Sequence, residues 1–564
     1  MGAPQAIRRF APGLTALGSY DRAWLRDDLV AGVSVAAVAV PIAIAYSQLA
    51  GVPPVNGLYA SILPLVAYAV FGTSRQLIVA PDAATCAIIA SVVVPLAGGD
   101  VARHVSLAMT LAVITGVICI AAGLGRLGFL ANFLSRPILA GYLNGIAISI
   151  ITGQLGKLSG VQLTPSGSFR QVAEFGARLG EVHGWTLAVG VAAFAGLRAL
   201  KHVAPKVPAP LVAVVVAIAA SRFLGLAGHG VAVLGAIPAG LPALTLPHIA
   251  PDDLLPLAYG AVGLALISFN SAMVTARGFA VKNRYDIDPN QEFIALGMAD
   301  IGAGALQGFA VSGADSRTAV NDAVGGKSQA TGLVAAVLLV LTLVFFTGPL
   351  ASLPIAVLAA ILISSAIGLF DVPGLVALRR TSKPEFRLAI ITLLGVITVG
   401  VLPGVVVAIT IALVQLVAKA SHPHDAVLGR IAGVDGFHNL RRRPEAEPVP
   451  GMVIFRWDAP LVFFNADRFK SRVRSVVAES RGPVRYVVID AESMPQLDIT
   501  GAAGLGELHA ELAGRQIGLA IAGEHGQLSD MLSRSMLRDR IGAHLCVRTL
   551  DAAVAQLLQV SSQK

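Results

Sequence analysis

The sequence predicts a polytopic α-helical membrane protein of about 14 spans that carries a small α/β domain in its C-terminal part. The chain of 564 residues is 55% hydrophobic and only 13% charged, and its mean hydropathy is +0.74. Aliphatic stretches of membrane-spanning length recur up to about residue 420. Beyond that residue, short β-branched stretches alternate with amphipathic ones, which is typical of a soluble α/β domain.

The first part of the chain contains aliphatic stretches such as 29–49, 105–124, 211–226 and 333–346. One span needs about 20 apolar residues, and fewer suffice when the helix is broken. Counting these stretches gives roughly 12 to 14 spans, several of them short or interrupted by Gly or Pro. Such a composition excludes a soluble globular protein.

The net charge of +9 does not indicate a nucleic-acid partner, because most Lys and Arg residues lie beside the predicted spans. Cytoplasmic loops of membrane proteins are enriched in these residues. A 14-span topology with a cytoplasmic N-terminus places nearly all of them inside, and the outer loops 50–56 and 347–352 contain none. An even number of spans makes the C-terminus cytoplasmic too. We expect a multi-pass protein of the cell (inner) membrane, in contact with the lipid bilayer.

The sequence shows no motif of catalysis or metal binding. The three cysteines, Cys86, Cys119 and Cys546, lack the spacing of a metal site or a disulfide framework. No Ser-His-Asp, HExxH or P-loop pattern is found, and no signal-peptide cleavage site precedes the first span. We therefore expect no enzyme, no catalytic residue, no cofactor and no metal.

The composition divides the chain into four predicted parts. They are a cytoplasmic N-terminal segment (1–28), a transmembrane transport domain (29–420), a linker (421–450) rich in Arg, Pro and Glu, and a soluble domain (451–564). In the soluble domain we predict that Thr500 caps the second helix. The predicted strands are 452–457, 484–490, 517–522 and 545–547, and the predicted helices are 466–479, 500–512 and 551–560.

Two short broken segments carry polar residues inside otherwise apolar sequence, one at 80–85 and the other at 312–318. Bare backbone at membrane depth is tolerated only inside protein or beside a water-filled cavity. Paired interruptions in the two halves of a membrane protein are typical of a transporter's substrate site. The two segments are therefore the candidate binding region.

In the second broken segment, Ser312 and Asp315 fit the spacing of a capping box at a helix start. A helix N-terminus aimed into the protein attracts anions, and Arg317 adds a fixed positive charge. Charges at membrane depth are expensive and usually functional. The alternative for Arg317 is a buried ion pair with Asp315 or Asp322.

In the first broken segment, Asp82 follows a proline and is a good N-cap for the helix that begins after it. The alternative is that Asp82 faces a cavity and carries a proton. On a long span, 257–279, the polar residues Asn270, Ser271 and Thr275 either bond between helices or line the site.

Several of these motifs resemble the sulfate permease (SulP) family, bacterial relatives of the animal solute-carrier anion exchangers that include prestin. The matching stretches run along most of the chain, and the soluble domain resembles the family's STAS domain. The matching stretches are 41–61, 276–297, Gly313 to Asn321, Pro460 to Ala466 and Val488 to Glu492, and the last two lie in the soluble domain.

The resemblance implies 14 spans in a 7+7 inverted repeat, with the anion between the N-termini of the third and tenth spans. It assigns Ser316 and Arg317 to the tenth-span site and places Ala83, Ala84, Thr85 and Cys86 at the third-span site. Ser271 aligns with an eighth-span position that is acidic in cation-coupled members, so Asp82 and Asp315 are the candidates for coupling. The resemblance also implies a homodimer, and a cytoplasmic protein partner for the STAS domain.

The predicted function is secondary active transport of a small anion, most plausibly sulfate, by alternating access. Within transport, a bicarbonate or C4-dicarboxylate carrier is an alternative, since the family includes these as well. A further alternative is an anion channel or a sensor regulated by the STAS domain. The residues alone do not separate these substrates.

Overall fold

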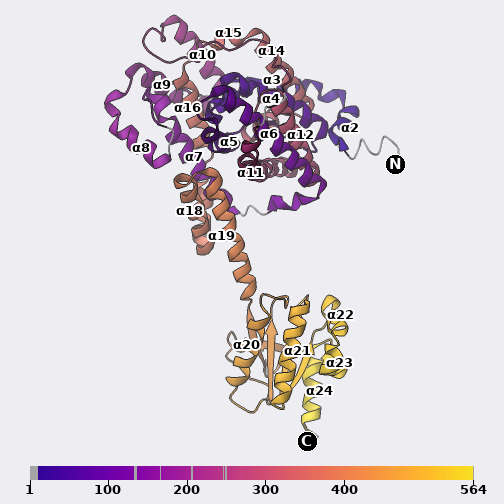
Figure 1. Cartoon of the computed structure of the whole chain (residues 1–564). Helices are drawn as coiled ribbons and strands as arrows, with labels where there is room; N and C mark the ends of the chain where they lie inside the picture. The colour runs from indigo at the N-terminus through magenta and orange to yellow at the C-terminus, as the bar shows by residue number, and fades with distance from the viewer. Residues whose placement is uncertain are drawn as a thin grey trace. The chain divides into compact units, whose positions relative to one another are not determined.

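The computed structural model describes residues 10–132, 136–164, 167–204, 207–245, 247 and 250–562. The first nine residues of the predicted N-terminal segment and the last two of the predicted soluble domain lie outside the described residues. The chain divides into two compact units, Met1–Thr410 and Ile411–Lys564 (Figure 1).

The first unit is helical, and fourteen described helices, the last of which (α19) continues into the second unit, stand where the sequence predicts spans. Among the described residues, seven helical segments are long and apolar enough to cross a membrane, and several others are shorter apolar helices. The fourteen are α3 (Leu25–Ala50), α4 (Pro54–Phe71), α5 (Ala83–Ala97), α6 (Val101–Leu124), α7 (Arg136–Ser159), α9 (Gly184–Val203), α10 (Ala209–Phe223), α11 (Pro251–Asn283), α12 (Pro289–Ala305), α13 (Asp315–Val324), α14 (Ala330–Phe345), α16 (Ile355–Ile367), α18 (Lys383–Thr398) and α19 (Val401–Ser421).

The shorter helical elements outside this set lie at the start of the chain and in the connections. They are α2 (Pro12–Gly18), α8 (Ser168–Ala177), α15 (Thr347–Leu350) and α17 (Val372–Thr381), with 3-10 turns at Arg22–Trp24, Leu127–Asn132 and Leu179–Glu181. The short helices α5 and α13 take the third place in each set of seven, as the resemblance implies for the third and tenth spans.

Glycines allow helices of the first unit to pack backbone against backbone. A β-carbon on Gly116 of α6 would lie 2.6 Å from the carbonyl oxygen of Gly297, and one on Gly297 of α12 would lie 2.5 Å from that of Gly116. Neither position can hold a larger residue without separating the two helices. The helices beside the broken segments therefore form a closely packed support.

Two buried carboxylates fix the loop before the first broken segment and the loop that follows α13. Glu292 of α12 accepts hydrogen bonds from the Tyr68 hydroxyl (2.6 Å) and from the Thr73 backbone N–H (2.8 Å). Asp28 of α3 accepts from the Lys327 N–H and the Ser328 hydroxyl, both at 2.6 Å. Buried charges are stable only when hydrogen-bonded in this way, so each carboxylate specifies one path for its loop.

The second unit contains a six-stranded sheet of order β4-β3-β5-β6-β7-β8, with helices on both of its faces (Figure 1). Strands β5 to β8 pair in parallel, and β3 pairs antiparallel with both β4 and β5. One core joins α20 and α21 to the sheet, and a second core joins α24 to the opposite face. The strands are β3 (Asp425–Ile431), β4 (Val434–Asn439), β5 (Met452–Trp457), β6 (Tyr486–Asp490), β7 (Gly518–Ala522) and β8 (Cys546–Val547), and the helices are α20 (Ala466–Ala478), α21 (Ile499–Gly514), α22 (Gly526–Arg534), α23 (Leu537–Ile541) and α24 (Leu550–Ser562), with a 3-10 turn at Ala543–Leu545.

The prediction of a linker over 421–450 is wrong for its central part, because residues 425–439 form the hairpin β3–β4. Side chains of β3 alternate partly between buried and exposed positions, and Gly433 between the two strands has a φ of +74°. The neighbouring Arg, Pro and Glu residues concealed this short strand pattern. The predicted strands and helices of 451–564 agree with β5 to β8, α20, α21 and α24 to within a few residues, whereas α22 and α23 were not predicted.

The prediction that Thr500 caps α21 is wrong. The N-cap of this helix is Asp498. One oxygen of the Asp498 carboxylate accepts from the Gly501 N–H at 2.6 Å, and the other accepts from the Phe463 N–H at 2.8 Å. Aspartate is among the strongest N-cap residues, and here it begins the helix two residues earlier.

Replacing this cap by Asp498→Ala is expected to lower the free energy of unfolding of the second unit by about 1–2 kcal/mol. Thr500→Ala is the matched control and should change it little. Urea unfolding followed by the fluorescence of Trp457, which is fully buried in this unit, measures both once Trp24 and Trp185 of the first unit are replaced by Phe. Equal losses in the two variants would contradict the assignment of the cap.

Candidate functional site

The two broken segments meet at a short antiparallel ribbon between β1 (Val79–Ala80) and β2 (Ser312–Gly313). β1 leads into α5 and β2 leads into α13. Because the strands are antiparallel, the two helices leave the ribbon from opposite ends, and their N-terminal turns both adjoin it. The ribbon thus unites segments that are more than two hundred residues apart in the sequence.

Side-chain and backbone hydrogen bonds fasten α13 to the segment before α5. The Ala314 N–H donates to the Ile78 carbonyl at 2.8 Å, and the Ile78 N–H donates to the Thr318 hydroxyl at 3.0 Å. The Asn321 side-chain amide donates to the Gln76 carbonyl at 2.8 Å. The two helix starts therefore have one fixed relative position within this unit.

Asp82 is the N-cap of α5, as predicted, and accepts a hydrogen bond from the Thr85 N–H at 2.7 Å. The four residues of the first turn, Ala83 to Cys86, are all buried. Within the described residues, the buried hydroxyl oxygen of Thr85 has no hydrogen-bond partner. The first turn of α5 therefore offers one free hydroxyl in addition to its backbone N–H groups.

The predicted capping box of α13 is wrong. The N-cap is Ala314, and no side chain caps this helix. Ser312 lies in β2, where its hydroxyl donates to the Ser268 carbonyl of α11 at 2.8 Å, and Asp315 accepts from the Thr275 hydroxyl of the same helix. Because both side chains are hydrogen-bonded to α11, neither caps α13. The backbone N–H groups in the first turn of α13 therefore have no side-chain acceptor.

Arg317 is buried beside the ribbon, with only 1% of its surface exposed. Its Nη2 donates to the Pro81 carbonyl just before α5, and its guanidinium carbon lies 5.8 Å from the centre of the Tyr46 ring. Its Nε and Nη1 are buried and make no hydrogen bond within the part of the chain that the structure describes.

The ion pairs considered for Arg317 are not formed among the described residues. Asp322 pairs with Lys282 at 2.5 Å, and Asp315 is bonded to Thr275. A buried cation without an ionic partner costs free energy that an anion would offset. Since the guanidinium presents a planar fork of donors, an oxyanion suits it best.

None of the other predicted site residues carries a buried side-chain nitrogen or oxygen that lacks a hydrogen-bond partner among the described residues. Ser316 and Asp315 are exposed at the start of α13, and Ser271 of α11 is half-buried. Asn270 donates to the Leu266 carbonyl of its own helix at 2.9 Å. On this helix it is Thr275, rather than Ser271, that reaches α13. No sequence pattern points to the Pro81 carbonyl or to Tyr46 as contacts of Arg317, since both contacts depend on tertiary packing.

Among the described residues, no group of three or more His, Cys, Asp and Glu side chains is arranged to hold a metal ion. Cys86, Cys119 and Cys546 are buried free thiols. The polar groups around the ribbon are the Arg317 guanidinium, the Thr85 hydroxyl, the carboxylates of Asp82 and Asp315, and the N-termini of two helices.

Known proteins match both units of the chain. The sulfate permease family matches residues 25–392, and the STAS domain matches residues 443–555. A probable sulfate transporter of Mycobacterium tuberculosis is 40% identical over 545 residues, which are 97% of this chain and 97% of that protein. The chloroplastic sulfate transporter 4.1 of Arabidopsis thaliana is 30% identical over 560 residues, covering 96% of this chain and 81% of that protein.

Solved structures share the fold. The structure of SLC26A9 matches with a TM-score of 0.93 at 21% identity and covers 99% of this chain and 94% of that one. The transmembrane domain of a cyanobacterial bicarbonate transporter, BicA, matches with a TM-score of 0.60 at 23% identity, covering 70% of this chain and 98% of that one. By the family match over most of its length and by its similarity to the mycobacterial protein, the chain belongs to the sulfate permease family and carries a C-terminal STAS domain.

Proposed function

We propose that this protein is a secondary active transporter, not an enzyme, that carries sulfate across the cell membrane by alternating access. The observation that supports the proposal most directly is the buried guanidinium of Arg317, two of whose nitrogens lack a hydrogen-bond partner. The anion would lie beside Arg317, between the first turns of α5 and α13.

Sulfate is favoured over other small anions by two arguments. The relatives that match this chain over nearly its whole length are named sulfate transporters. A dianion with oxygens on every side can also use several donors at once, namely the guanidinium fork, the Thr85 hydroxyl and the N–H groups of two helix starts.

Uptake of labelled sulfate into proteoliposomes tests the proposal. We expect saturable uptake that unlabelled sulfate suppresses, with weaker competition by bicarbonate and C4-dicarboxylates at each of two pH values. Stronger competition by bicarbonate or a dicarboxylate would identify a different substrate. Sulfate binding without flux would indicate a sensor, and currents that do not saturate would indicate a channel.

We further propose that both termini are cytoplasmic, as the distribution of Lys and Arg suggests. The three native cysteines are buried, so a single cysteine introduced at an exposed site reports on its own side of the membrane. The C-terminal unit should react with a membrane-impermeant thiol reagent only after the cells are opened. A homodimer and a protein partner of the STAS domain remain predictions, which crosslinking in membranes can test.

Asp82 is the stronger of the two candidates for proton coupling, because its carboxylate is half-buried at the start of α5, whereas Asp315 is exposed at the start of α13. In Asp82→Asn the side-chain oxygen can still accept from the Thr85 N–H, but the group can no longer exchange a proton. We therefore expect sulfate uptake that no longer changes with pH, and the same test applies to Asp315→Asn.

A matched control for this experiment is Asp100→Asn. Asp100 likewise caps a helix, α6, accepting from the Ala102 N–H at 2.8 Å and from the Arg103 N–H at 3.3 Å, but it is exposed. Its replacement should leave the pH profile of uptake unchanged. A wild-type pH profile in both Asp82→Asn and Asp315→Asn would rule out coupling through these carboxylates.

A further inference from the structure

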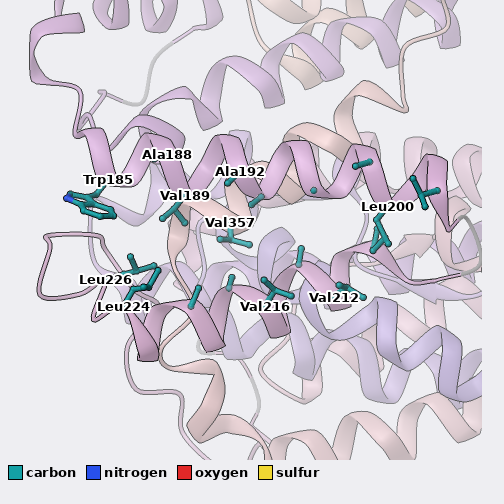
Figure 2. A pocket seen from close by; sticks show the side chains of 18 residues that line it. Trp185, Ala188, Val189, Ala192, Leu200, Val212, Val216, Leu224, Leu226 and Val357 are labelled. Atoms are coloured by element: carbon teal, nitrogen blue, oxygen red, sulfur yellow. The ribbon is translucent and has the colours of Figure 1, made fainter.

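The groove between α9 and α10 does not offer a second place for the transported anion. Its volume is about 610 Å³, and Figure 2 shows side chains of both helices directed into it, from Trp185 at one end to Leu200 and Val212 at the other. The side chains that line it are apolar, apart from the indole nitrogen of Trp185. An anion taken out of water needs several donors, so we expect any further donor for it near the ribbon of the two broken segments.

Tyr142 of α7 carries a buried hydroxyl without a partner. Only 2% of the residue is exposed, and its hydroxyl oxygen makes no hydrogen bond among the described residues. The residue belongs to the apolar core of the first unit. A buried tyrosine hydroxyl usually finds a hydrogen-bond partner, and leaving it unpaired costs free energy. A ligand that accepts this hydrogen bond would offset the cost.

The backbone of α7 near Tyr142 is held in place by two glycines that pack against α18. A β-carbon on Gly141 would overlap the carbonyl oxygen of Ala389, and one on Gly145 would lie 2.8 Å from the Cβ of Val396. The two glycines are four residues apart and so lie on one face of the helix. Tyr142 is rotated about 100° from Gly141 around the helix axis. The close packing on α18 therefore fixes the position from which Tyr142 extends.

Tyr142 lies near the start of α5, which forms one side of the proposed anion site. α7 packs against α5, and the Tyr142 hydroxyl interacts electrostatically with the carboxylate of Asp82, the N-cap of α5. Tyr46, which contacts the Arg317 guanidinium, interacts with the same carboxylate. The Tyr46 hydroxyl also interacts with Ser365 of α16. Of these two tyrosines, it is Tyr142 whose hydroxyl has no partner among the described residues.

From these observations we propose that Tyr142 is a further binding residue for the transported anion, to which its hydroxyl donates a hydrogen bond from α7. The assignment rests on the proposed anion site beside Arg317 and adds a donor from a helix outside the ribbon. A tetrahedral oxyanion presents oxygens in more than one plane, so one oxygen can accept from Tyr142 while the planar guanidinium fork holds others. Tyr142 therefore contributes to the preference for an anion such as sulfate.

Tyr142→Phe tests the proposal, because it removes the hydroxyl and keeps the ring. Sulfate is titrated into the purified full chain at constant ionic strength, and the rise in unfolding temperature gives the Kd. Since a hydrogen bond to a charged group is lost, we expect the Kd for sulfate to rise about tenfold or more. The KM of sulfate uptake into proteoliposomes should rise in parallel. An unchanged Kd would overturn the proposal.

The unfolding temperature without any anion separates binding from a structural role. Because Tyr142→Phe removes a buried hydroxyl that has no partner, the variant should unfold at the wild-type temperature or higher. A lower temperature would mean that the hydroxyl bonds within the protein, and the proposal would fail. Tyr259→Phe is the matched control, since Tyr259 of α11 is 71% exposed, and its replacement should leave the Kd for sulfate unchanged.

A double variant distinguishes a hydrogen bond to the anion from one to Asp82. In the Asp82→Asn background, Tyr142→Phe should still weaken sulfate binding by about the same factor, because the acceptor is the anion. If the effect of Tyr142→Phe disappears in this background, the hydroxyl acts through Asp82 and the assignment to the anion is wrong.

The same titration with bicarbonate and with succinate keeps the role of Tyr142 separate from the identity of the substrate. If one of these anions stabilises the wild type and sulfate does not, the proposed substrate is wrong. A higher Kd for that anion in Tyr142→Phe would still support the assignment of Tyr142, and an equal Kd would overturn it. If none of the three anions stabilises the wild type, both the proposed site and the role of Tyr142 are wrong.

Discussion

Replacing Arg317 by Gln is expected to abolish saturable sulfate uptake. The variant removes the charge and the two unpaired donors, Nε and Nη1, that we assign to the anion. Hydrogen bonds to charged groups contribute about 1.5–3 kcal/mol each, so losing two weakens sulfate binding by roughly a hundredfold or more. Initial rates of labelled uptake into proteoliposomes over a range of sulfate concentrations measure this loss.

Misfolding can be separated from loss of binding in the Arg317→Gln variant. A buried, ionically unpaired guanidinium destabilises the protein without its anion, so the variant should unfold at the same temperature as the wild type or higher. Sulfate should raise the unfolding temperature of the wild type only, because a ligand at a hundred times its Kd stabilises by about 2.7 kcal/mol.

Arg75→Gln is the matched control for Arg317→Gln. Arg75 is exposed, and within the described part of the chain its guanidinium lies over the Tyr285 ring, 5.4 Å from the ring centre. Its replacement should leave uptake near the wild-type rate. An Arg317→Gln variant with wild-type KM and rate would place the anion elsewhere in the protein.

The sequence was sufficient to predict the helical membrane fold and to locate both broken segments. Their polar residues interrupt apolar stretches, and such interruptions are visible without any structure. The cap formed by Asp82 was equally predictable, since Pro81 precedes it and a helix follows. These features depend on neighbouring residues in the chain, which is why sequence patterns report them.

Errors arose where tertiary contacts competed with local patterns. Ser312 and Asp315 have the spacing of a capping box. In the structure, however, Ser312 pairs with β1 as part of a strand, and the Asp315 carboxylate accepts a hydrogen bond from the Thr275 hydroxyl. Thr500 is a residue type that often caps helices. Asp498 caps this helix instead, and its carboxylate also accepts a hydrogen bond from the backbone N–H of Phe463 on a distant loop. Residues far apart in sequence decided each case.

The contacts of Arg317 could not be predicted from the sequence either, because they are made by residues far from it in the chain. Its ion pair with Asp315 or Asp322 was a reasonable alternative from spacing on one helix. In the structure Lys282 of α11 holds Asp322, and the Pro81 carbonyl faces the guanidinium from across the ribbon. The packing of α11 and β1 against α13 leaves the arginine without a salt bridge among the described residues.

Replacing Gly313 by Ala is expected to lower sulfate uptake at least tenfold. A β-carbon on Gly313 would lie 2.6 Å from the Cα of Ala272 and 3.0 Å from the side chain of Leu77. The nearest atom is backbone, so it cannot rotate away. Either β2 shifts from α11 or the pairing with β1 breaks, and overpacking of this kind costs about 1–3 kcal/mol. Displacing the ribbon moves Arg317 relative to the start of α5.

Gly278→Ala provides the control for Gly313→Ala. Gly278 lies on α11, and a β-carbon there would have no atom within 4 Å. Alanine favours a helix over glycine by about 0.5–1 kcal/mol, so this variant should be as stable as the wild type or slightly more. Uptake and thermal unfolding of both variants are compared in the same proteoliposome and detergent preparations. Wild-type uptake by Gly313→Ala would contradict this prediction. It would mean that the close approach of β2 to α11 is not needed to position the starts of α5 and α13 for transport.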